Sequence, residues 1–211
     1  MKFLGRWLPL VQFDGSENYW RRRYELGGDS GRGSEGRAAN YKAAVLNSFV
    51  EEHQAVSVIE HGCGDGRQLT LARYPSYLGL DVSPQAIDRC RRTFASRPEM
   101  RFELASAYAG EVGDLAVSLD VIYHLVEDEV YFRYLDRLFQ SALCYAVIYS
   151  TVANVPKRTL THVRHRSVDQ DVAERFPAFA RMTDYEAGLP QPVEFGKGGA
   201  TRFLFYKRVE R

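Results

Sequence analysis

Residues 58–66 read VIEHGCGDG, and they are the strongest indication of the fold class. An apolar run rich in β-branched residues at 56–60 ends in Glu60, and glycines follow at positions 62, 64 and 66. Glycine lets a backbone turn sharply and approach a ligand without a Cβ clash. The helix expected just beyond leaves free backbone N–H groups that point into the turn. A strand, a glycine-rich turn and a helix in this order predict the opening unit of a ligand-binding α/β domain.

The rest of the chain extends this alternation. Apolar runs predict strands at 56–60, 77–81, 100–104, 115–121 and 144–151, and an alternating tail predicts a late antiparallel strand at 201–207. Amphipathic segments predict helices at 17–26, 37–53, 83–95 and 128–143, and a short one at 68–74. Strands alternating with helices predict an α/β fold with a mostly parallel sheet and helices on both faces.

Composition narrows the class of protein. The 211 residues suit one domain, and 28 basic against 27 acidic residues give a net charge of only +1. This balance argues against a dedicated nucleic-acid binder. Three cysteines form neither a disulfide framework nor a zinc site. No apolar run is long enough to insert into a membrane, and a short apolar patch within residues 3–8 is interrupted by Gly5 and Arg6. We therefore expect a cytoplasmic protein.

A glycine-rich stretch precedes the α/β pattern. Residues 27–36 read GGDSGRGSEG, with five glycines in ten residues. Such a loop between two helices is either a plain linker or a lid that becomes ordered over a ligand. We predict a lid, so that residues 1–54 form an N-terminal helical segment with its lid and residues 55–211 form the core of the same domain.

Two acids indicate which ligand the glycine turn binds. Glu60 precedes the glycines, and Asp81 ends the next strand, 21 residues later. In nucleotide-binding α/β folds, an acid at the position of Asp81 binds ribose hydroxyls. A carboxylate at Glu60 would repel the pyrophosphate of a dinucleotide, but it would attract an ammonium group. The pattern therefore favours S-adenosylmethionine (SAM), which has a ribose and an α-ammonium group but no phosphate.

The chain resembles the class I SAM-dependent methyltransferases through VIEHGCGDG, YLGLDVSPQAI (77–87) and SLDVIYHL (118–125). The resemblance implies a Rossmann-like fold with a seven-stranded sheet. A front end reading NYWRRRYELGGDSGRGSEGRAANYKAAVLN (18–47) and a downstream HVRHR (162–166) are similar to a bacterial group that methylates sugars and glycan precursors. For this chain that likeness implies methyl transfer to a hydroxyl of a sugar or glycoside.

The motifs also identify candidate cofactor residues. They are Tyr19, Lys42, Glu60, Gly62, Cys63, Gly64, Asp81, Val82, Ser106 and Asp120. Many family members have an acid near the adenine, where this chain reads Leu104-Ala105-Ser106-Ala107, so we expect Ser106 to bind the adenine amine instead. Cys63 is expected to be a small spacer. Trp20 and Tyr24 are expected to pack as ordinary helix residues.

Asp120, Tyr123 and His124 are the candidate catalytic residues, because they follow the fourth strand, where ligands of open α/β sheets bind. A neutral imidazole at His124 can take the proton of an acceptor hydroxyl. The alternative is a structural histidine that caps the following turn.

The segment after the fifth strand is the candidate substrate-binding element. It contains His162, Arg164, His165 and Arg166, and charge-assisted bonds from such residues can hold polyhydroxylated or anionic acceptors. His162 and His165 are rival candidates for the general base. A solvated basic loop is the alternative interpretation.

Other classes are less compatible with the sequence. The acids at 127–129 fit the start of a helix better than a magnesium site, so no metal is expected. A nucleic-acid methyltransferase would carry an N/D-P-P-Y-type tetrad after the fourth strand, where this chain reads DVIY (120–123). A methyltransferase for nitrogen or oxygen of another small molecule and a non-catalytic SAM-binding partner protein remain alternatives. The chain is compatible with a homodimer.

Overall fold

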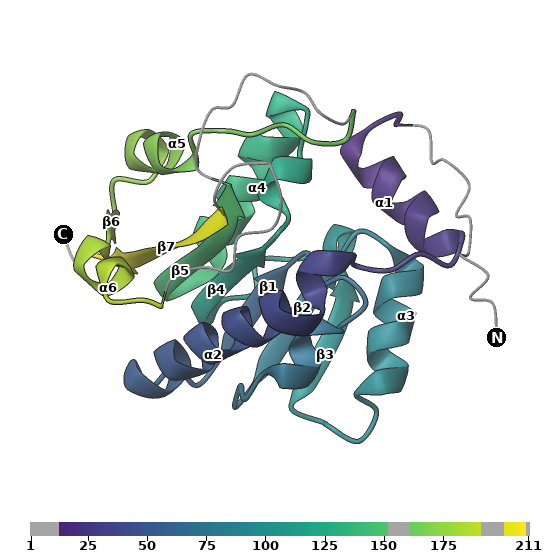
Figure 1. Ribbon diagram of the computed structural model, residues 1–211, viewed down its shortest axis with the longest axis horizontal. Helices are drawn as coiled ribbons and strands as arrows, with labels where there is room; N and C mark the ends of the chain where they lie inside the picture. Colours follow the sequence, from purple (N-terminus) through teal and green to yellow (C-terminus); the bar gives the residue numbers. More distant parts are fainter. Residues whose placement is uncertain (1–12, 152–160, 191–200, 210–211) are drawn as a thin grey trace.

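A seven-stranded sheet forms the centre of the molecule (Figure 1). The computed structural model describes residues 13–151, 161–190 and 201–209. The strand order is β3-β2-β1-β4-β5-β7-β6. The strands are β1 Val58–His61, β2 Tyr77–Asp81, β3 Met100–Leu104, β4 Gly113–Leu119, β5 Ala142–Thr151, β6 Phe179–Arg181 and β7 Thr201–Arg208.

Pairing in the sheet is parallel from β3 through β5 and antiparallel on both sides of β7. Strand β1 lies between β2 and β4, with Glu60 opposite Gly79 on one side and opposite Val117 on the other. Strand β7 runs antiparallel to both β5 and β6. All residues of β1 and β2 are buried, as expected for strands covered on both faces. The order reverses between β1 and β4, and open α/β sheets bind their ligands at such a point.

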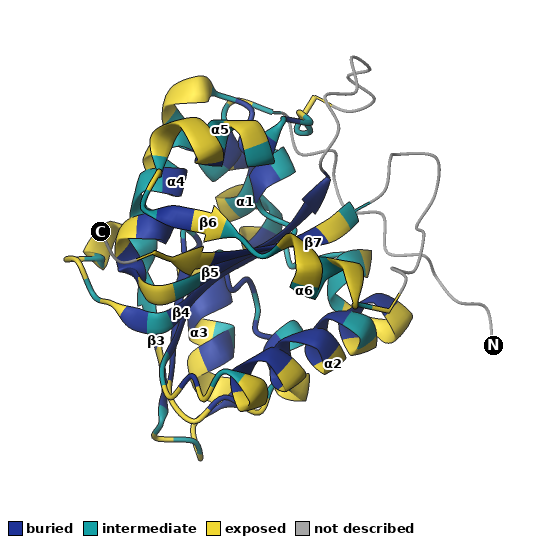
Figure 2. Cartoon of the chain, turned by 90° about the vertical axis from the view of Figure 1, so that its left-hand side faces the viewer, coloured by how far each residue is buried: buried dark blue, intermediate teal, exposed yellow. Residues whose placement is uncertain are grey.

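Helices cover both faces of the sheet (Figure 2). On one face lie α2 Gly36–Glu52, α3 Pro84–Thr93 and α6 Thr183–Ala187, and on the other lie α4 Asp128–Ser141 and α5 Val168–Arg175. Helix α2 buries Leu46 and Phe49 completely, and α4 does the same with Leu135 and Leu138. Helix α3 begins at the expected cap, where the Ser83 hydroxyl accepts a hydrogen bond from the Ala86 N–H (3.3 Å). These two apolar layers hold the strand ends in place.

Helix α1, Ser16–Glu25, lies apart from these layers and is tied to the carboxyl-end side of the sheet. At its start, the Ser16 N–H donates to the Glu127 carboxylate (2.9 Å). Further along, Arg21 Nε donates to the Val82 carbonyl (3.0 Å). After its end, Arg89 of α3 donates to the Gly28 carbonyl (2.5 Å). Figure 1 shows the helix alongside α3 and α4. The helix therefore covers the edge at which a ligand would bind.

The sequence-based boundaries of β2 and β3 agree with the structure at every residue. The 68–74 segment is shorter than expected, with one 3₁₀ turn, η2 Gln68–Leu71. Besides the 3₁₀ turns, two helices and one strand were missed, namely α5, α6 and β6. They are short and polar, and most of their residues remain partly exposed, so no apolar period marks them.

Two expectations concern residues that the structure does not cover or only partly covers. The apolar patch at 3–8 lies outside the described residues. Within the described ranges, no helix is both long enough and apolar enough to cross a bilayer.

Candidate active site

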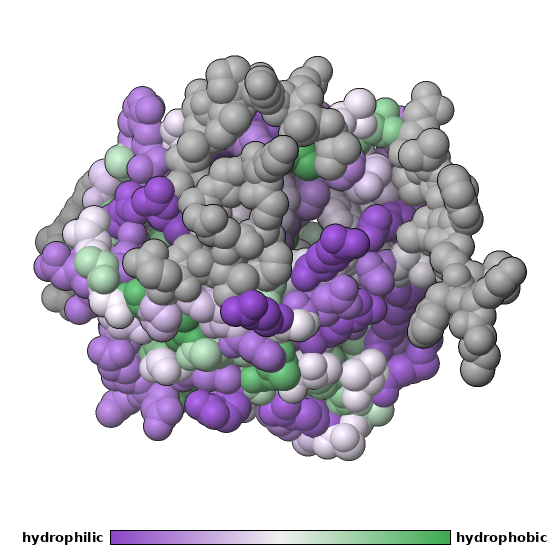
Figure 3. Space-filling model, viewed as in Figure 1, coloured by the Kyte–Doolittle hydropathy of each residue, from purple (hydrophilic) through white to green (hydrophobic). Residues whose placement is uncertain are grey.

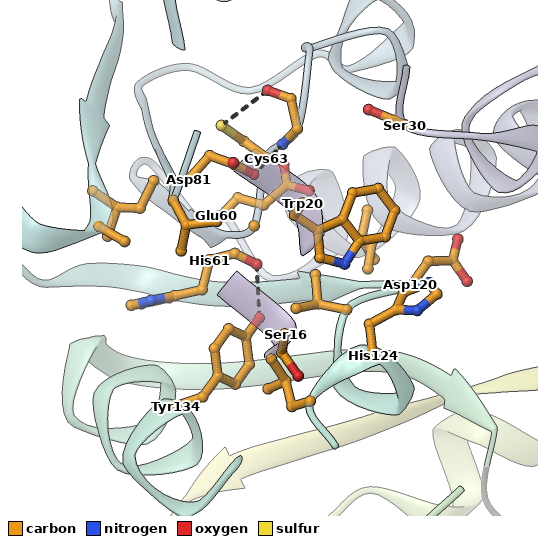
Figure 4. Close-up of a pocket in the computed structure, with 18 of the residues that line it drawn as sticks. Ser16, Trp20, Ser30, Glu60, His61, Cys63, Asp81, Asp120, His124 and Tyr134 are labelled. Carbon is orange, nitrogen blue, oxygen red and sulfur yellow. Dashed lines mark hydrogen bonds between the residues drawn. The ribbon is translucent and has the colours of Figure 1, made fainter. Parts of the chain in front are cut away.

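A pocket of about 1100 Å³, including its open mouth, lies at the carboxyl ends of β1, β2 and β4 under α1 (Figure 4). Figure 3 shows hydrophilic side chains over the neighbouring surface of α1 and α3. Nine of the residues proposed from sequence line the pocket. They are Lys42, Glu60, Gly62, Cys63, Gly64, Asp81, Val82, Asp120 and His124. The strand ends, helix α2 and the turn after β4 thus bring together residues that lie up to 82 positions apart in the chain.

Glu60 is a buried carboxyl group at the end of β1. It is 5% exposed, and the one hydrogen bond that it accepts from the described residues comes from the Tyr77 hydroxyl (2.6 Å). Burial raises the pKa of Glu60 to about 7, although the Tyr77 hydrogen bond and the nearby Lys42 charge act in the opposite direction. A buried carboxyl group with so few donors is well suited to bind a ligand cation.

Asp81 ends β2 and is held by backbone donors. Its two oxygens accept hydrogen bonds from the Gly64 N–H (2.9 Å) and the Ser83 N–H (2.9 Å). Burial raises the pKa of Asp81 to about 6, against the lowering effect of these bonds. Each carboxylate oxygen retains a lone pair, so the side chain can still accept hydrogen bonds from two hydroxyls.

Gly64 of the glycine turn permits a close approach by the loop between α1 and α2. Its φ is 58°, and a Cβ at this position would clash with the Ser30 hydroxyl group. Ser30 donates to the Asp65 carboxylate (2.7 Å) and bonds to the Tyr24 hydroxyl (2.8 Å). Within this loop lies one 3₁₀ turn, η1 Arg32–Ser34. Residues 27–36 therefore dock on the glycine turn, although whether they act as a lid stays a prediction.

Lys42 is an ammonium group enclosed in the protein. Its side chain is 1% exposed, and Nζ donates to Asp120 Oδ2 (2.5 Å). The other oxygen of Asp120 accepts a hydrogen bond from the Tyr123 hydroxyl (3.0 Å). Asp120 has a φ of 59°, an uncommon conformation for a residue with a side chain. An ammonium group has three donors, so Lys42 has the capacity to bind a ligand carboxylate in addition to Asp120.

His124 lies on the opposite wall of the pocket, in the 3₁₀ turn η4 Ile122–His124. Its Nδ1 is 3.1 Å from the His162 carbonyl oxygen. A carbonyl can only accept, so Nδ1 carries the proton and Nε2 keeps its lone pair. Burial lowers the pKa of His124 to about 4. The imidazole is therefore neutral at pH 7 and presents a proton acceptor.

Helix α1 contributes two residues to the pocket lining that were expected, from the sequence, to pack as ordinary helix residues. Trp20 and Tyr24 of α1 both line the pocket. The Trp20 ring meets the His124 ring edge to face, with centroids 4.9 Å apart. In Figure 4 the Trp20 ring lies between Cys63 and His124. Helical periodicity marks a buried face but does not reveal whether protein or ligand will cover it, and so these two residues were missed.

The structure places other candidates outside the pocket lining. Tyr19 is buried against the His162 ring (4.4 Å between centroids), because Trp20 and not Tyr19 faces the pocket. Ser106 is exposed on a 3₁₀ turn, η3 Ala105–Ala107, and Ala105 is the residue that lines the pocket. Tyr123 reaches the site through its bond to Asp120. Direct cofactor binding by Tyr19 and Ser106 is therefore not what this geometry favours.

The segment 162–166 lies beside η4 but does not line the pocket. His162 stacks on His124 (5.6 Å between centroids), and His165 Nδ1 bonds to the Thr151 hydroxyl (2.7 Å). Arg164 and Arg166 both pair with Asp128 (2.8 and 2.5 Å). Substrate binding by these four residues stays a prediction.

Several further lining residues were not among the candidates from sequence. They are Ser16, Glu17, Ser34, His61, Gln68, Arg133, Tyr134 and Arg137. His61 is the notable case, because burial lowers its pKa to about 4 and its Nε2 bonds to the Ser141 hydroxyl (3.0 Å). His61 follows Glu60 directly in the motif, which could have marked it.

The acids at 127–129 each have a partner in the protein. Glu127 binds the start of α1 through Ser16, and Glu129 pairs with Arg133 (3.3 Å). Among the described residues, no group of three or more His, Cys, Asp or Glu side chains could hold a metal ion. Chemistry without a metal stays a prediction.

Comparison with known proteins agrees with the geometry. Residues 59–142 match the family described as "Methyltransferase domain". The N-methyltransferase NodS from Bradyrhizobium japonicum WM9, solved with S-adenosyl-L-homocysteine, is similar over 93% of this chain and 100% of its own, with a TM-score of 0.69 and 16% identity.

Magnesium protoporphyrin IX methyltransferase (ChlM) from Synechocystis PCC 6803 is similar over 90% of this chain and 93% of its own, with a TM-score of 0.60 and 16% identity. At these identities the likeness shows the fold. No curated protein matches the chain.

Proposed function

We propose that the chain is a class I SAM-dependent methyltransferase and that it transfers the methyl group to a hydroxyl of a sugar or glycoside. One observation carries the proposal for a hydroxyl acceptor. His124, whose Nδ1 lies against the His162 carbonyl and whose imidazole is neutral, lines the same pocket as Glu60 and Asp81. A hydroxyl must lose its proton as its oxygen attacks, and a neutral imidazole can accept it.

The cofactor side of the pocket fits SAM. We assign Glu60 to the α-ammonium group, Asp81 to the ribose hydroxyls and Lys42 to the carboxylate, since each keeps free bonding capacity. The apolar side chains of Leu80, Val82 and Ala105 supply a surface for the adenine. When bound, SAM supplies an electrophilic methyl group on a positively charged sulfur. The protein's contribution is then proximity, orientation and a proton acceptor.

On the acceptor side, the pocket residues orient the acceptor, and one of them takes the proton of its hydroxyl. Trp20 and His124 form one corner of the pocket, and His124 Nε2 takes the hydroxyl proton. Asp120 lines the pocket just beyond β4, and the Tyr123 hydroxyl holds its carboxylate through a hydrogen bond. His162, Arg164 and His165 lie behind His124, toward the surface, where a larger acceptor would extend.

Support for a sugar acceptor comes from the sequence. The front end at 18–47 and the HVRHR at 162–166 are the parts that resemble sugar and glycan methyltransferases. That resemblance extends to the 1-O-methyltransferase of methylmannose polysaccharide synthesis. We therefore propose the 1-hydroxyl of a 3-O-methylmannoside as the first acceptor to test, a cytoplasmic location, and a lid function for residues 27–36.

An acceptor panel with labelled SAM tests the proposal. We expect methyl transfer to mannosides or related glycosides, with an ether-linked methyl group in the product. Transfer only to amines or to non-sugar hydroxyls would replace the sugar by another small molecule. SAM binding without turnover on any acceptor would favour a non-catalytic partner protein. His124→Ala is the control for each active acceptor, because it removes the proposed proton acceptor and leaves the cofactor residues in place.

A further inference from the structure

Residues 162–166 run alongside the turn that carries His124. The Arg164 N–H donates to the Tyr123 carbonyl (2.8 Å), and His124 Nδ1 donates to the His162 carbonyl (3.1 Å). Two hydrogen bonds therefore join the 162–166 segment to the turn, one at the Tyr123 carbonyl and one at the His124 side chain. The protonation pattern of the His124 ring depends on one of these bonds.

Arg166 anchors this segment. Its side chain is 7% exposed, and its guanidinium group lies 4.1 Å from the centre of the Tyr131 ring. Nη2 donates to the carbonyls of Leu125 (3.2 Å) and Val126 (3.0 Å), while Nη1 pairs with Asp128 (2.5 Å). A planar guanidinium group suits such a set of acceptors, and an ammonium group does not reproduce it. The Nη donors of Arg166 therefore point into the turn that directly follows His124, whereas its buried Nε has no partner among the described residues.

The same turn is held from its other side by α1. The Val126 N–H donates to the Ser16 hydroxyl (2.9 Å), and this hydroxyl donates to the Glu127 carboxylate (2.5 Å). Residues 125–128 are thus fixed between the start of α1 and the guanidinium group of Arg166. A turn held on both sides gives the preceding residue, His124, a defined position.

We propose that Arg166 is a positioning residue for His124, because it clamps residues 162–166 onto the 125–128 turn and so keeps the His162 carbonyl against Nδ1 of the imidazole. The Nε2 lone pair is then presented to the acceptor in every molecule. This inference rests on the proposed role of His124 as the proton acceptor. It assigns Arg166 no contact with the substrate, since its Nη donors bind the chain itself.

The test compares three arginine variants. Arg166→Gln removes the guanidinium group and its hydrogen bonds to the 125–128 turn. Arg166→Lys keeps the positive charge but not the planar arrangement of donors. Arg175→Gln is the matched control, because Arg175 also pairs with an acid of α4, Asp136 (2.7 Å), but on the exposed side of that helix. Nitrogen-15 NMR of histidine-labelled protein reports which ring nitrogen of His124 carries the proton, and it needs no acceptor.

We expect His124 to be protonated on Nδ1 in the parent and in Arg175→Gln. In Arg166→Gln we expect a mixture of both tautomers and a kcat about tenfold lower, with the acceptor KM and the SAM Kd within about twofold of the parent. Arg166→Lys should lie between the two, and it carries the test if Arg166→Gln does not fold.

Two results would overturn the inference. One is a His124 ring that stays protonated on Nδ1 in both Arg166 variants. The other is a raised acceptor KM at unchanged kcat, which would make Arg166 a substrate contact. If His124→Ala keeps its full turnover, the proposed base is wrong, while the tautomer measurement still decides whether Arg166 positions the ring.

Discussion

The cofactor side and the acceptor side of the pocket are built in different ways. On the cofactor side, Glu60 and Asp81 lie at two neighbouring strand ends within 22 residues of sequence, and the N–H of Gly64 in the turn between them donates to Asp81. On the acceptor side, Trp20 and His124 come from a covering helix and a 3₁₀ turn more than 100 residues apart. The first arrangement follows from strand register, whereas the second depends on how the cover and the 162–166 segment pack.

Burial has opposite electrostatic effects on the two sides. It raises the pKa of Glu60 to about 7 and that of Asp81 to about 6, and it lowers the pKa of His124 to about 4. In each case the neutral form is favoured, because a charge is costly away from water. On the cofactor side this leaves carboxyl groups that a cationic ligand can ionise. On the acceptor side it leaves a neutral imidazole, whose lone pair is free at pH 7 but whose proton affinity burial has lowered.

Removal of the imidazole should give the largest effect. We expect His124→Ala to lower kcat by about two orders of magnitude, because a general base contributes about 10²–10⁴-fold. The SAM Kd should stay within a few-fold of the parent, since His124 is assigned to the proton and not to the cofactor. Steady-state kinetics and calorimetry measure the two quantities.

The rival histidines supply the controls for this measurement. His162→Ala and His165→Ala should each retain far more activity than His124→Ala, because neither residue lines the pocket. Loss of activity in one of them, with His124→Ala near full activity, would move the base to the 162–166 segment.

On the cofactor side, Asp81→Ala should weaken SAM binding by about 1–3 kcal/mol, because hydrogen bonds to a charged group are lost. Asp88→Asn, an exposed acid on α3, is the matched control and should bind SAM like the parent. Calorimetry with SAM and with NAD checks the cofactor as well. Saturable binding of NAD without a response to SAM would contradict the assignment.

The two sides should also respond differently to pH. SAM binding favours ionised Glu60, whose pKa is about 7 in the free protein. As pH falls from 7.5 to 6, we expect the SAM Kd to rise by up to about tenfold, since a proton must be released on binding. At saturating SAM, kcat should hold down to about pH 5, because His124 is protonated only near its pKa of about 4.

Glu60→Gln is the control for this pH dependence. It should bind SAM more weakly than the parent does at pH 8, and its Kd should change little with pH. An equally steep pH dependence in Glu60→Gln would show that another group binds the proton.

A smaller effect is expected where the loop meets the glycine turn. Ser30→Ala removes the bonds to Asp65 and Tyr24, and we expect it to lower the free energy of unfolding by about 1 kcal/mol. Ser34→Ala, in the same loop, is the control, because the described residues show no hydrogen bond from its hydroxyl. Urea unfolding measures both.

Limited proteolysis tests the proposed lid. If residues 27–36 close over bound ligands, SAM plus acceptor should slow cleavage within them in the parent. Equal cleavage with and without ligands would favour a plain linker.

The sequence predicted the cofactor side better than the acceptor side. Glu60, Gly64 and Asp81 were identified because a strand that ends in a glycine turn places its neighbours through register alone. Trp20 was interpreted as packing, because the sequence does not reveal what an amphipathic helix covers. For Arg166, substrate binding stays a prediction from the HVRHR motif, and its pairing with Asp128 could not be predicted, because it is a tertiary contact over 38 residues.

The buried charges in the pocket affect the relative affinity for SAM and for its demethylated product. Glu60 and Asp81 are buried carboxyl groups, and Lys42 is the one buried lysine or arginine among the described residues that line the pocket. SAM carries a net charge of +1, whereas the demethylated product has lost its sulfonium charge. With both carboxyl groups ionised, the pocket attracts the donor more strongly than the product, and product inhibition is therefore weakest at high pH. Protonation of Glu60 cancels that advantage, so the ratio of product Kd to SAM Kd should fall as pH falls from 8 to 6.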